Sequence, residues 1–159
     1  MKSKIFALAV VLTLNGCGAW ERNSKPVPAF NGKSVKNSKS AVLSTRGLNG
    51  NLIGQVSEVD GIKMSCLAYG CPSFVRISEG THTFTIKAFL LNGINYYRSG
   101  QIDLVVKDMK ARHIYEVTIK DHGETFGASY NDLGENPVYG ITLGLKGINQ
   151  KFIPIRFED

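Results

Sequence analysis

Short apolar runs of period two, separated by turn residues, extend from Ala41 to the end of the chain and limit its fold more than any other feature. Alternation of apolar and polar residues places one face of a strand in a core and the other in solvent. It is clear in His82–Ala88, Ile102–Val106 and His113–Ile119. No segment shows a convincing helical period of 3.6 residues. The sequence therefore predicts an all-β chain.

Turn signals divide this region into strands. Asn92-Gly93 is a strong signal for a two-residue hairpin. Further breaks are expected at Lys107–Lys110, Asp121–Gly123 and Asn131–Pro137, and the last two strands at Val138–Leu145 and Ile148–Phe157. About seven to nine strands at such spacing favour a single small antiparallel β-sandwich, immunoglobulin-like or transthyretin-like, with a small β-barrel as the alternative. Pro154 cannot donate a ladder hydrogen bond, which places the last strand at an edge.

The first 16 residues have the pattern of a secretory signal. Lys2 and Lys4 form a basic start, Ile5–Leu14 is an apolar run, and polar or small residues follow. Ten apolar residues are too few to span a bilayer. Residues 1–16 are therefore interpreted as a signal peptide.

The segment Leu14-Asn15-Gly16-Cys17 that follows resembles the lipobox of bacterial lipoproteins. The resemblance implies a diacylglyceryl group on the Cys17 thiol, cleavage before Cys17, and acylation of the new amine, with palmitate as an expected chain. Gly18, where an Asp would act as a retention signal, implies the outer membrane. The alternative is an ordinary secretory signal that ends at a chance cysteine.

Residues 17–40 are expected to form a flexible basic tether that joins the lipidated cysteine to a domain at residues 41–159. Residues 18–40 carry a net charge of +4, whereas residues 41–159 hold twelve basic and twelve acidic residues. A neutral domain offers no basic stripe for a nucleic acid, so none is expected as a partner. The basic tether either attracts an anionic leaflet or only keeps the segment soluble. Docking of Val27 or Phe30 on the domain is the alternative to a free tether.

Two short segments carry a second resemblance. Val59-Asp60-Gly61 and the later segment Phe74–Ile86, with Gly80-Thr81-His82 at its centre, resemble PEGA-type and related small sandwich modules of bacterial envelope proteins. These modules pair an Asp-Gly turn with a Pro-Gly-x-His hairpin, and here Glu79 stands in place of the proline. Gly80 fits because a tight turn needs a positive φ. The likeness concerns the fold class alone.

Cysteine and histidine are the residues that most often carry chemistry. Without Cys17, Cys66 and Cys71 remain, and in an oxidising compartment such a pair most simply forms a disulfide. A redox pair usually has two intervening residues, and a zinc site needs further ligands. His82, His113 and His122 lie far apart in the sequence, although Glu124, two positions after His122, offers a nearby carboxylate. We therefore expect structural or surface histidines and no metal site.

No catalytic residue is predicted, because no H-E-x-x-H, G-x-S-x-G or paired-carboxylate pattern is present. Tyr96, Tyr97 and Arg98 are the candidate binding residues, since two aromatic rings beside a guanidinium can form a stacking platform for a glycan or peptide. The alternative is that one tyrosine packs across strands while the other faces solvent.

These observations together predict a lipoprotein anchored in the outer membrane, with its domain facing the periplasm. Its expected role is a non-enzymatic adaptor or accessory subunit that contacts an envelope protein. No cofactor is expected beyond the lipid on Cys17. The alternative is a ligand-binding or inhibitor module that captures a hydrolase, a glycan or a toxin. A third reading, an envelope hydrolase, requires a histidine and a carboxylate within hydrogen-bond reach in an accessible cleft.

Overall fold

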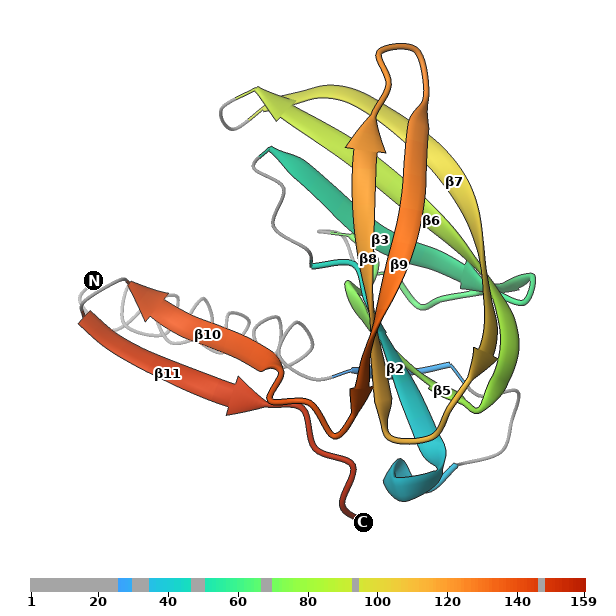
Figure 1. The fold of residues 1–159 in the computed structure, drawn as a ribbon. Helices are drawn as coiled ribbons and strands as arrows, with labels where there is room; N and C mark the ends of the chain where they lie inside the picture. Colours follow the sequence, from blue (N-terminus) through green and yellow to red (C-terminus); the bar gives the residue numbers. More distant parts are fainter. Residues whose placement is uncertain (1–25, 30–34, 47–50, 67–69, 93–94, 146–147) are drawn as a thin grey trace, which may run out of the picture.

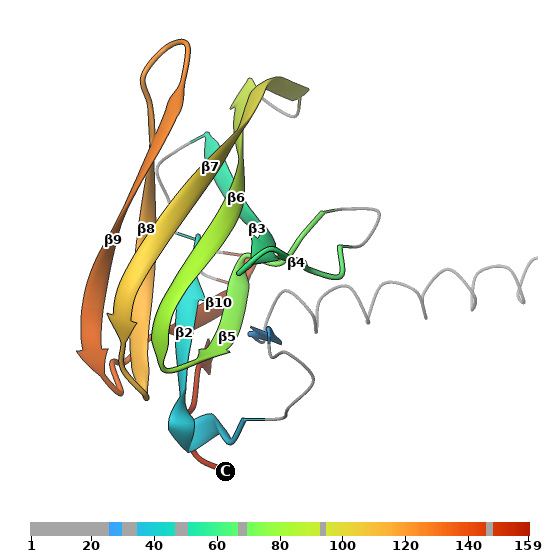
Figure 2. The ribbon, with the colours of Figure 1, turned by 90° about the vertical axis from the view of Figure 1, so that its right-hand side faces the viewer.

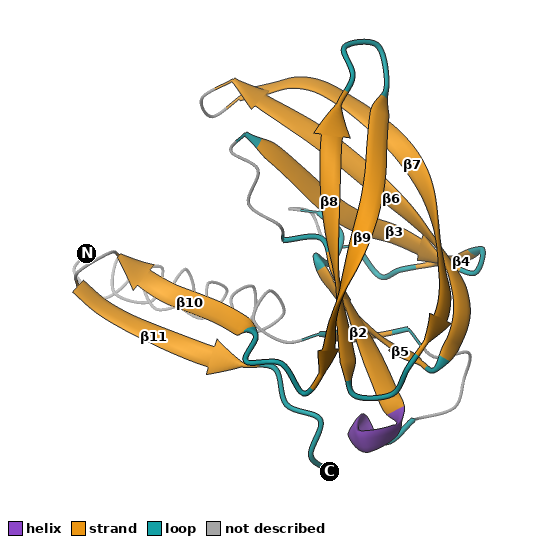
Figure 3. Cartoon of the chain, viewed as in Figure 1, coloured by secondary structure: helices purple, strands orange, loops and turns teal. Residues whose placement is uncertain are grey.

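The computed structural model shows a β-sandwich from which one hairpin projects (Figures 1 and 3). It describes residues 26–29, 35–46, 51–66, 70–92, 95–145 and 148–159. Residues 1–16, Cys17 and Phe30 lie outside these ranges, so the predictions made for them remain predictions. The prediction of an all-β chain is confirmed for the described part, whose only helical segment is one 3₁₀ turn.

Eleven strands and this turn, η1, occur in the described part of the chain. In order they are β1 (Val27–Pro28), η1 (Asn37–Lys39), β2 (Ser40–Ser44), β3 (Leu52–Val59), β4 (Ile62–Lys63), β5 (Phe74–Ser78), β6 (Gly80–Asn92), β7 (Asn95–Met109), β8 (His113–Asp121), β9 (Phe126–Glu135), β10 (Gly140–Leu145) and β11 (Ile148–Pro154). A hairpin joins β6 to β7 close to the expected position. Asn92 pairs with Asn95, so Asn92 belongs to β6 and not, as predicted, to the two-residue turn.

Two sheets face each other, and a hairpin forms a third. The first sheet has the order β1-β5-β2-β8-β9, the second β4-β3-β6-β7, and β10 pairs only with β11. None of these sheets closes on itself in the described structure, so the fold is the sandwich and not the barrel alternative. Figure 2 shows the two layers from the side, with β8 and β9 in one and β3, β6 and β7 in the other.

The sheets are not purely antiparallel, and this corrects the prediction. β1 pairs with β5, and β2 with β8, in parallel. Between β2 and β8 the chain crosses to the second sheet for β3 and β4, returns for β5, and crosses again for β6 and β7. Parallel neighbours need such long crossover connections. Local alternation of residues contains no information on the direction of a neighbouring strand.

The main core lies between the two sheets and follows the predicted alternation. Phe84, Ile86 and Ala88 of β6 point inward, as do Leu104 and Val106 of β7, and all are buried. A second cluster lies on the outer face of the first sheet, at the root of the projecting hairpin. Its buried members are Val42, Phe74, Ile114, Ile141, Ile155 and Phe157. Strand β2 is consequently buried on both faces.

Strand boundaries differ from the predictions where pairing continues into polar sequence. β9 runs to Glu135, five residues into the expected loop, because its pairing with β8 continues until Glu135 faces His113. β7 similarly continues to Met109, which is buried, across most of the expected break. Polar residues on the solvent side of a strand can resemble a loop in sequence.

The segment between Cys17 and the domain is not free along its whole length. Val27 pairs with Val75, and the Ala29 amide donates a hydrogen bond to the Arg76 carbonyl over 2.8 Å. Docking of Val27, the alternative to a fully flexible tether, is therefore what the structure shows. Ser38 also bonds through its hydroxyl to the carboxylate of Asp159 over 2.6 Å, at the other end of the chain.

Candidate binding groove

A groove opens where the edge strands of the two sheets, β1 and β4, lie on the same side of the sandwich (Figure 2). It encloses about 420 Å³, a volume typical of small-ligand or side-chain pockets. Its walls are mostly apolar and its far end is polar. The lining residues are Val27, Pro28, Ala29, Val35, Val59, Asp60, Ile62, Lys63, Met64, Ser65, Ile77, Ser78 and His82.

Asp60 organises the polar end of this groove. Asp60 and Gly61 both have positive φ, +51° and +77°, as a two-residue type I′ hairpin between β3 and β4 requires. The Asp60 carboxylate accepts hydrogen bonds from the Thr83 amide at 2.8 Å and from His82 Nδ1 at 2.7 Å. The Asp60 amide donates in turn to the Thr83 carbonyl. The Asp60-Gly61 turn and the start of β6 therefore meet, and the polar residues of both hold the turn against β6.

His82 and Asp60 meet the geometric condition set for a hydrolase, but their hydrogen bonds argue against that chemistry. His82 Nε2 lies 3.1 Å from the Ser78 carbonyl oxygen, which can only accept, while Nδ1 faces the carboxylate. A general base needs a ring nitrogen with a free lone pair directed at its substrate or nucleophile. Both nitrogens of His82 are engaged with oxygen acceptors, so this pair is suited to fixing the turn.

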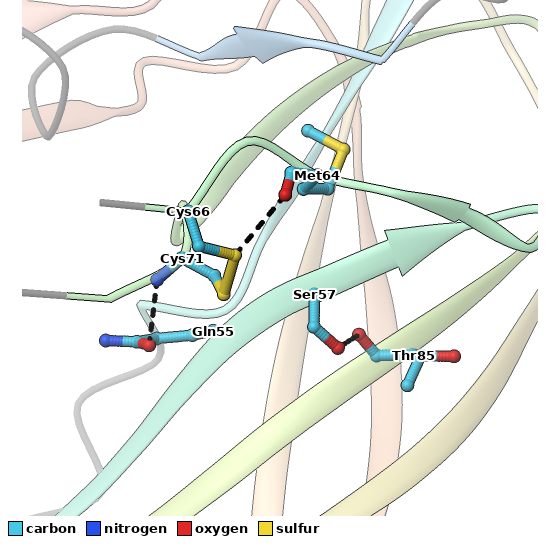
Figure 4. Close-up of a disulfide and its surroundings, with 6 residues drawn as sticks. All are labelled: Gln55, Ser57, Met64, Cys66, Cys71 and Thr85. Carbon is cyan, nitrogen blue, oxygen red and sulfur yellow. Dashed lines mark hydrogen bonds between the residues drawn. A yellow bond between two sulfur atoms is a disulfide. The ribbon is translucent and has the colours of Figure 1, made fainter. Parts of the chain in front are cut away.

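A disulfide lies next to Met64, one of the residues that line the groove (Figure 4). Cys66 and Cys71 are bonded, as the sequence predicts, within the connection between β4 and β5. This connection is also tied to β3, because the Met64 amide donates to the Ser57 carbonyl and the Cys71 amide to Gln55 Oε1. Met64 and Ser65, which line the groove, lie at the start of the cross-linked segment. The bond therefore restrains one wall.

The groove is suited to a ligand or side chain that carries an apolar group and, at one end, a polar group. Ile62 at its rim is 50% exposed although its side chain is large and apolar, and Lys63 beside it supplies a positive charge. Sequence analysis did not identify these residues. The only local signal is the pair of apolar residues, Ile62 and Met64, that follows the Asp-Gly turn.

Tyr96, Tyr97 and Arg98 do not form the single platform considered from sequence. Leu90 pairs with Arg98 and Leu91 with Tyr96, so Tyr97 is the extra residue of a β-bulge, and it is 72% exposed. The Arg98 guanidinium lies over the Phe126 ring, 4.7 Å from its centre, and pairs with Asp121. Arg98 thus links β7 to β9, and the position of the Tyr96 side chain lies outside the description.

The remaining histidines lie in separate places. His113 Nδ1 is 2.8 Å from the Asp132 carboxylate, which also accepts a bond from the Gly134 amide. Partial burial of Asp132 opposes its ionisation, but these bonds together lower its pKa. His122 and Glu124 are both exposed in the turn between β8 and β9. Among the described residues, no group of three His, Cys, Asp or Glu side chains could hold a metal ion.

Two polar side chains that sequence reasoning missed, the buried Arg76 and the partly buried Tyr139, support the second cluster. Arg76 is only 8% exposed, and burial lowers its pKa; it donates to Ser40 Oγ and to the Arg156 carbonyl, both at 2.8 Å. The Tyr139 hydroxyl donates to Glu116 Oε1 and lies 2.8 Å from Ser44 Oγ. Both side chains join the first sheet to the segments that flank the hairpin.

Comparisons of the chain with models of known protein families, with curated proteins and with solved structures found no match. The structure contains no helix, within the part of the chain that it describes, with the length and apolar character needed to cross a bilayer.

Proposed function

We propose that this chain is a lipid-anchored lipoprotein of the bacterial outer membrane that acts, without catalysis, as an adaptor for an envelope protein. The observation that carries the proposal is that the predicted anchor and the groove are close together along the chain. The lipobox-like Leu14–Cys17 is followed, ten residues after Cys17, by β1, and β1 forms one wall of the apolar groove. A partner seated in the groove is then separated from the proposed anchor by only about ten residues of chain.

The hydrogen bonds at the polar end support a binding role. His82 has both ring nitrogens engaged, and the groove wall is restrained by the disulfide and by bonds to β3. A restrained, largely apolar cavity with a few polar groups has the character of a binding site, because less ordering is needed when a partner enters.

The test is photo-cross-linking in cells, with a photoreactive residue in place of Ile62 at the rim of the groove. Val105 on β7 is the matched control, because its exposed fraction, 48%, is close to the 50% of Ile62. One dominant envelope protein is expected to cross-link through position 62 but not through position 105. This product should be lost when Cys17→Ser removes the anchor. Equal labelling from both positions, or none, would refute the adaptor.

A ligand-binding or inhibitor module is the second candidate, and the volume of the groove, about 420 Å³, favours it. Such a module binds through the domain alone. The same cross-link through position 62 should then persist, undiminished, in the Cys17→Ser form. The two candidates therefore differ in one measured quantity.

A further inference from the structure

The hairpin β10–β11 projects from the sandwich and pairs with no other described strand (Figure 1). A two-stranded hairpin has little stability by itself in water. Here its root is held, because Ile141, Ile155 and Phe157 are buried against the outer face of the first sheet. Arg76 adds a hydrogen bond to the Arg156 carbonyl just after β11. The hairpin is thus presented on a fixed base.

The two faces of the hairpin differ near this base. Ile141 pairs with Ile153, and Ile141 is buried toward the second cluster. Thr142 pairs with Phe152 and Gly140 with Pro154, so these four residues share the opposite face. On this face Phe152 is 48% exposed. Val138, in the bend two residues before β10, is 94% exposed. Large apolar side chains therefore meet solvent along the projecting element.

Positive charge exceeds negative charge in the segment that contains this hairpin. Residues 136–157 contain three basic residues, Lys146, Lys151 and Arg156, and no acidic residue. The rest of the domain, residues 41–135 and 158–159, contains nine basic and twelve acidic residues. Arg156 is exposed, with the Glu158 carboxylate 3.9 Å away. The neutral total found from sequence hides a charge of +3 in residues 136–157, the segment that contains the hairpin, and a charge of −3 in the rest of the domain.

We propose that the β10–β11 hairpin is a membrane contact that lies on an anionic phospholipid surface. Exposed aromatic and apolar side chains such as Phe152 and Val138 are suited to the interfacial region of a bilayer. Basic residues near an anionic leaflet are attracted to it, less strongly in high salt. The acidic remainder of the domain is repelled by the same surface, so the charge distribution also orients the molecule.

The contact is compatible with the proposed anchor but does not depend on it. Val27 is ten residues after Cys17. An extended chain covers about 3.3–3.6 Å per residue, so the anchor permits the domain to stand up to about 33–36 Å from the bilayer. A lipid on Cys17 alone therefore leaves the orientation of the domain open. The hairpin supplies a second point of attachment.

The test places a tryptophan reporter on the hairpin of the full chain. Phe152→Trp is made in a Trp20→Phe background, and Tyr97→Trp, on the bulge of β7, is the matched reporter away from the hairpin. Each protein is mixed with vesicles of phosphatidylglycerol and phosphatidylethanolamine, or of phosphatidylcholine, that contain brominated acyl chains. Sedimentation of the vesicles is measured in parallel.

The expected result is a blue shift and strong quenching at position 152 in phosphatidylglycerol vesicles, and neither at position 97. Adding Lys151→Glu and Arg156→Glu should abolish most of the quenching while unfolding temperature is retained. The proposal is overturned if position 152 is quenched no more than position 97, whether or not the protein sediments. It is also overturned if iodide fails to reach position 152 without vesicles, because the hairpin is then covered by protein.

Discussion

Single side chains hold together segments that are distant in sequence, and Asp60 is the clearest case. Its carboxylate receives a backbone amide and an imidazole from β6 while its own backbone has positive φ. Asp and Asn tolerate that conformation better than other non-glycine residues. Residue 60 therefore has both a conformational and a hydrogen-bonding role.

Replacement of Asp60 should separate these two roles. Asp60→Ala is expected to lower the free energy of unfolding by about 1–3 kcal/mol, because the hydrogen bonds are lost and alanine disfavours positive φ. Asp60→Asn should cost clearly less, since its amide oxygen can still accept from the Thr83 amide. Urea unfolding of the two variants measures the difference. Equal losses would contradict the assigned hydrogen bonds.

Tyr139 gives a pH dependence at the same scale. Burial raises the pKa of Tyr139 to about 12, and the hydrogen bond it donates to Glu116 acts in the same direction. The folded pKa lies above the ordinary value of 10, so this contribution to stability is complete below pH 10 and is lost as pH rises from about 10 to 12. Burial also raises the pKa of Tyr115, which should add to the alkaline loss in both proteins compared below.

Tyr139→Phe removes the titrating group and provides the measurement. At pH 7 the variant should be less stable by about 1 kcal/mol, since two hydrogen bonds are lost. Its free energy of unfolding should then fall less steeply than that of the wild type between pH 10 and 12. A constant difference between the two proteins over this range would show that Tyr139 does not titrate as described.

Among the elements, the connection between β4 and β5 shows, in its described residues, how a short irregular segment is tied to a neighbouring strand. The disulfide closes it on itself, and two hydrogen bonds tie it to β3 on either side of the cystine. The wall of the groove is part of this connection. Its order therefore depends more on cross-links than on a strand ladder.

Removal of the disulfide should weaken both stability and the groove. By the loop-entropy relation, a six-residue loop is stabilised by about 2 kcal/mol, less any strain. The Cys66→Ser, Cys71→Ser double variant should unfold at correspondingly lower urea concentration, and hydrogen exchange should increase at Met64 and Ser65. Thiol labelling of the native wild type should find neither cysteine free. Unchanged exchange at Met64 would show that the bonds to β3 suffice.

For the whole molecule, the two sides of the sandwich are built differently. On one side β7 approaches β9 so closely that a Cβ at Gly100 would lie 2.6 Å from the Phe126 ring, which Arg98 covers. On the other side the short edge strands β1 and β4 leave the groove. One side is closed by packing, and the other is available for binding.

Gly100→Ala tests the closed side. Because the Phe126 ring is held by Arg98, the added methyl group should cost about 1–3 kcal/mol of stability by overpacking. Ser99→Ala, at the exposed neighbouring position, should cost much less. Thermal unfolding of the two variants is compared. A neutral Gly100→Ala would mean that β7 and β9 separate without cost.

The sequence by itself determined features that depend on neighbouring residues. Alternation in β6, β7 and β8 gave the all-β class and the inward faces, and Cys66 and Cys71 were correctly expected to pair. Strand ends were less predictable, as β9 shows, because pairing with β8 carries it through polar residues. The lipid on Cys17 and the role of Tyr97 stay predictions.

Only the tertiary structure decided which segments meet. Local patterns do not encode strand order, so the parallel pairing of β2 with β8, the docking of Val27 and the contact of Asp60 with His82 could not be read from them. The excess of positive charge around the hairpin is recognised only once β10 and β11 are known to project from the two larger sheets. Period two fixes the face on which a side chain lies, whereas long-range packing selects what that face meets.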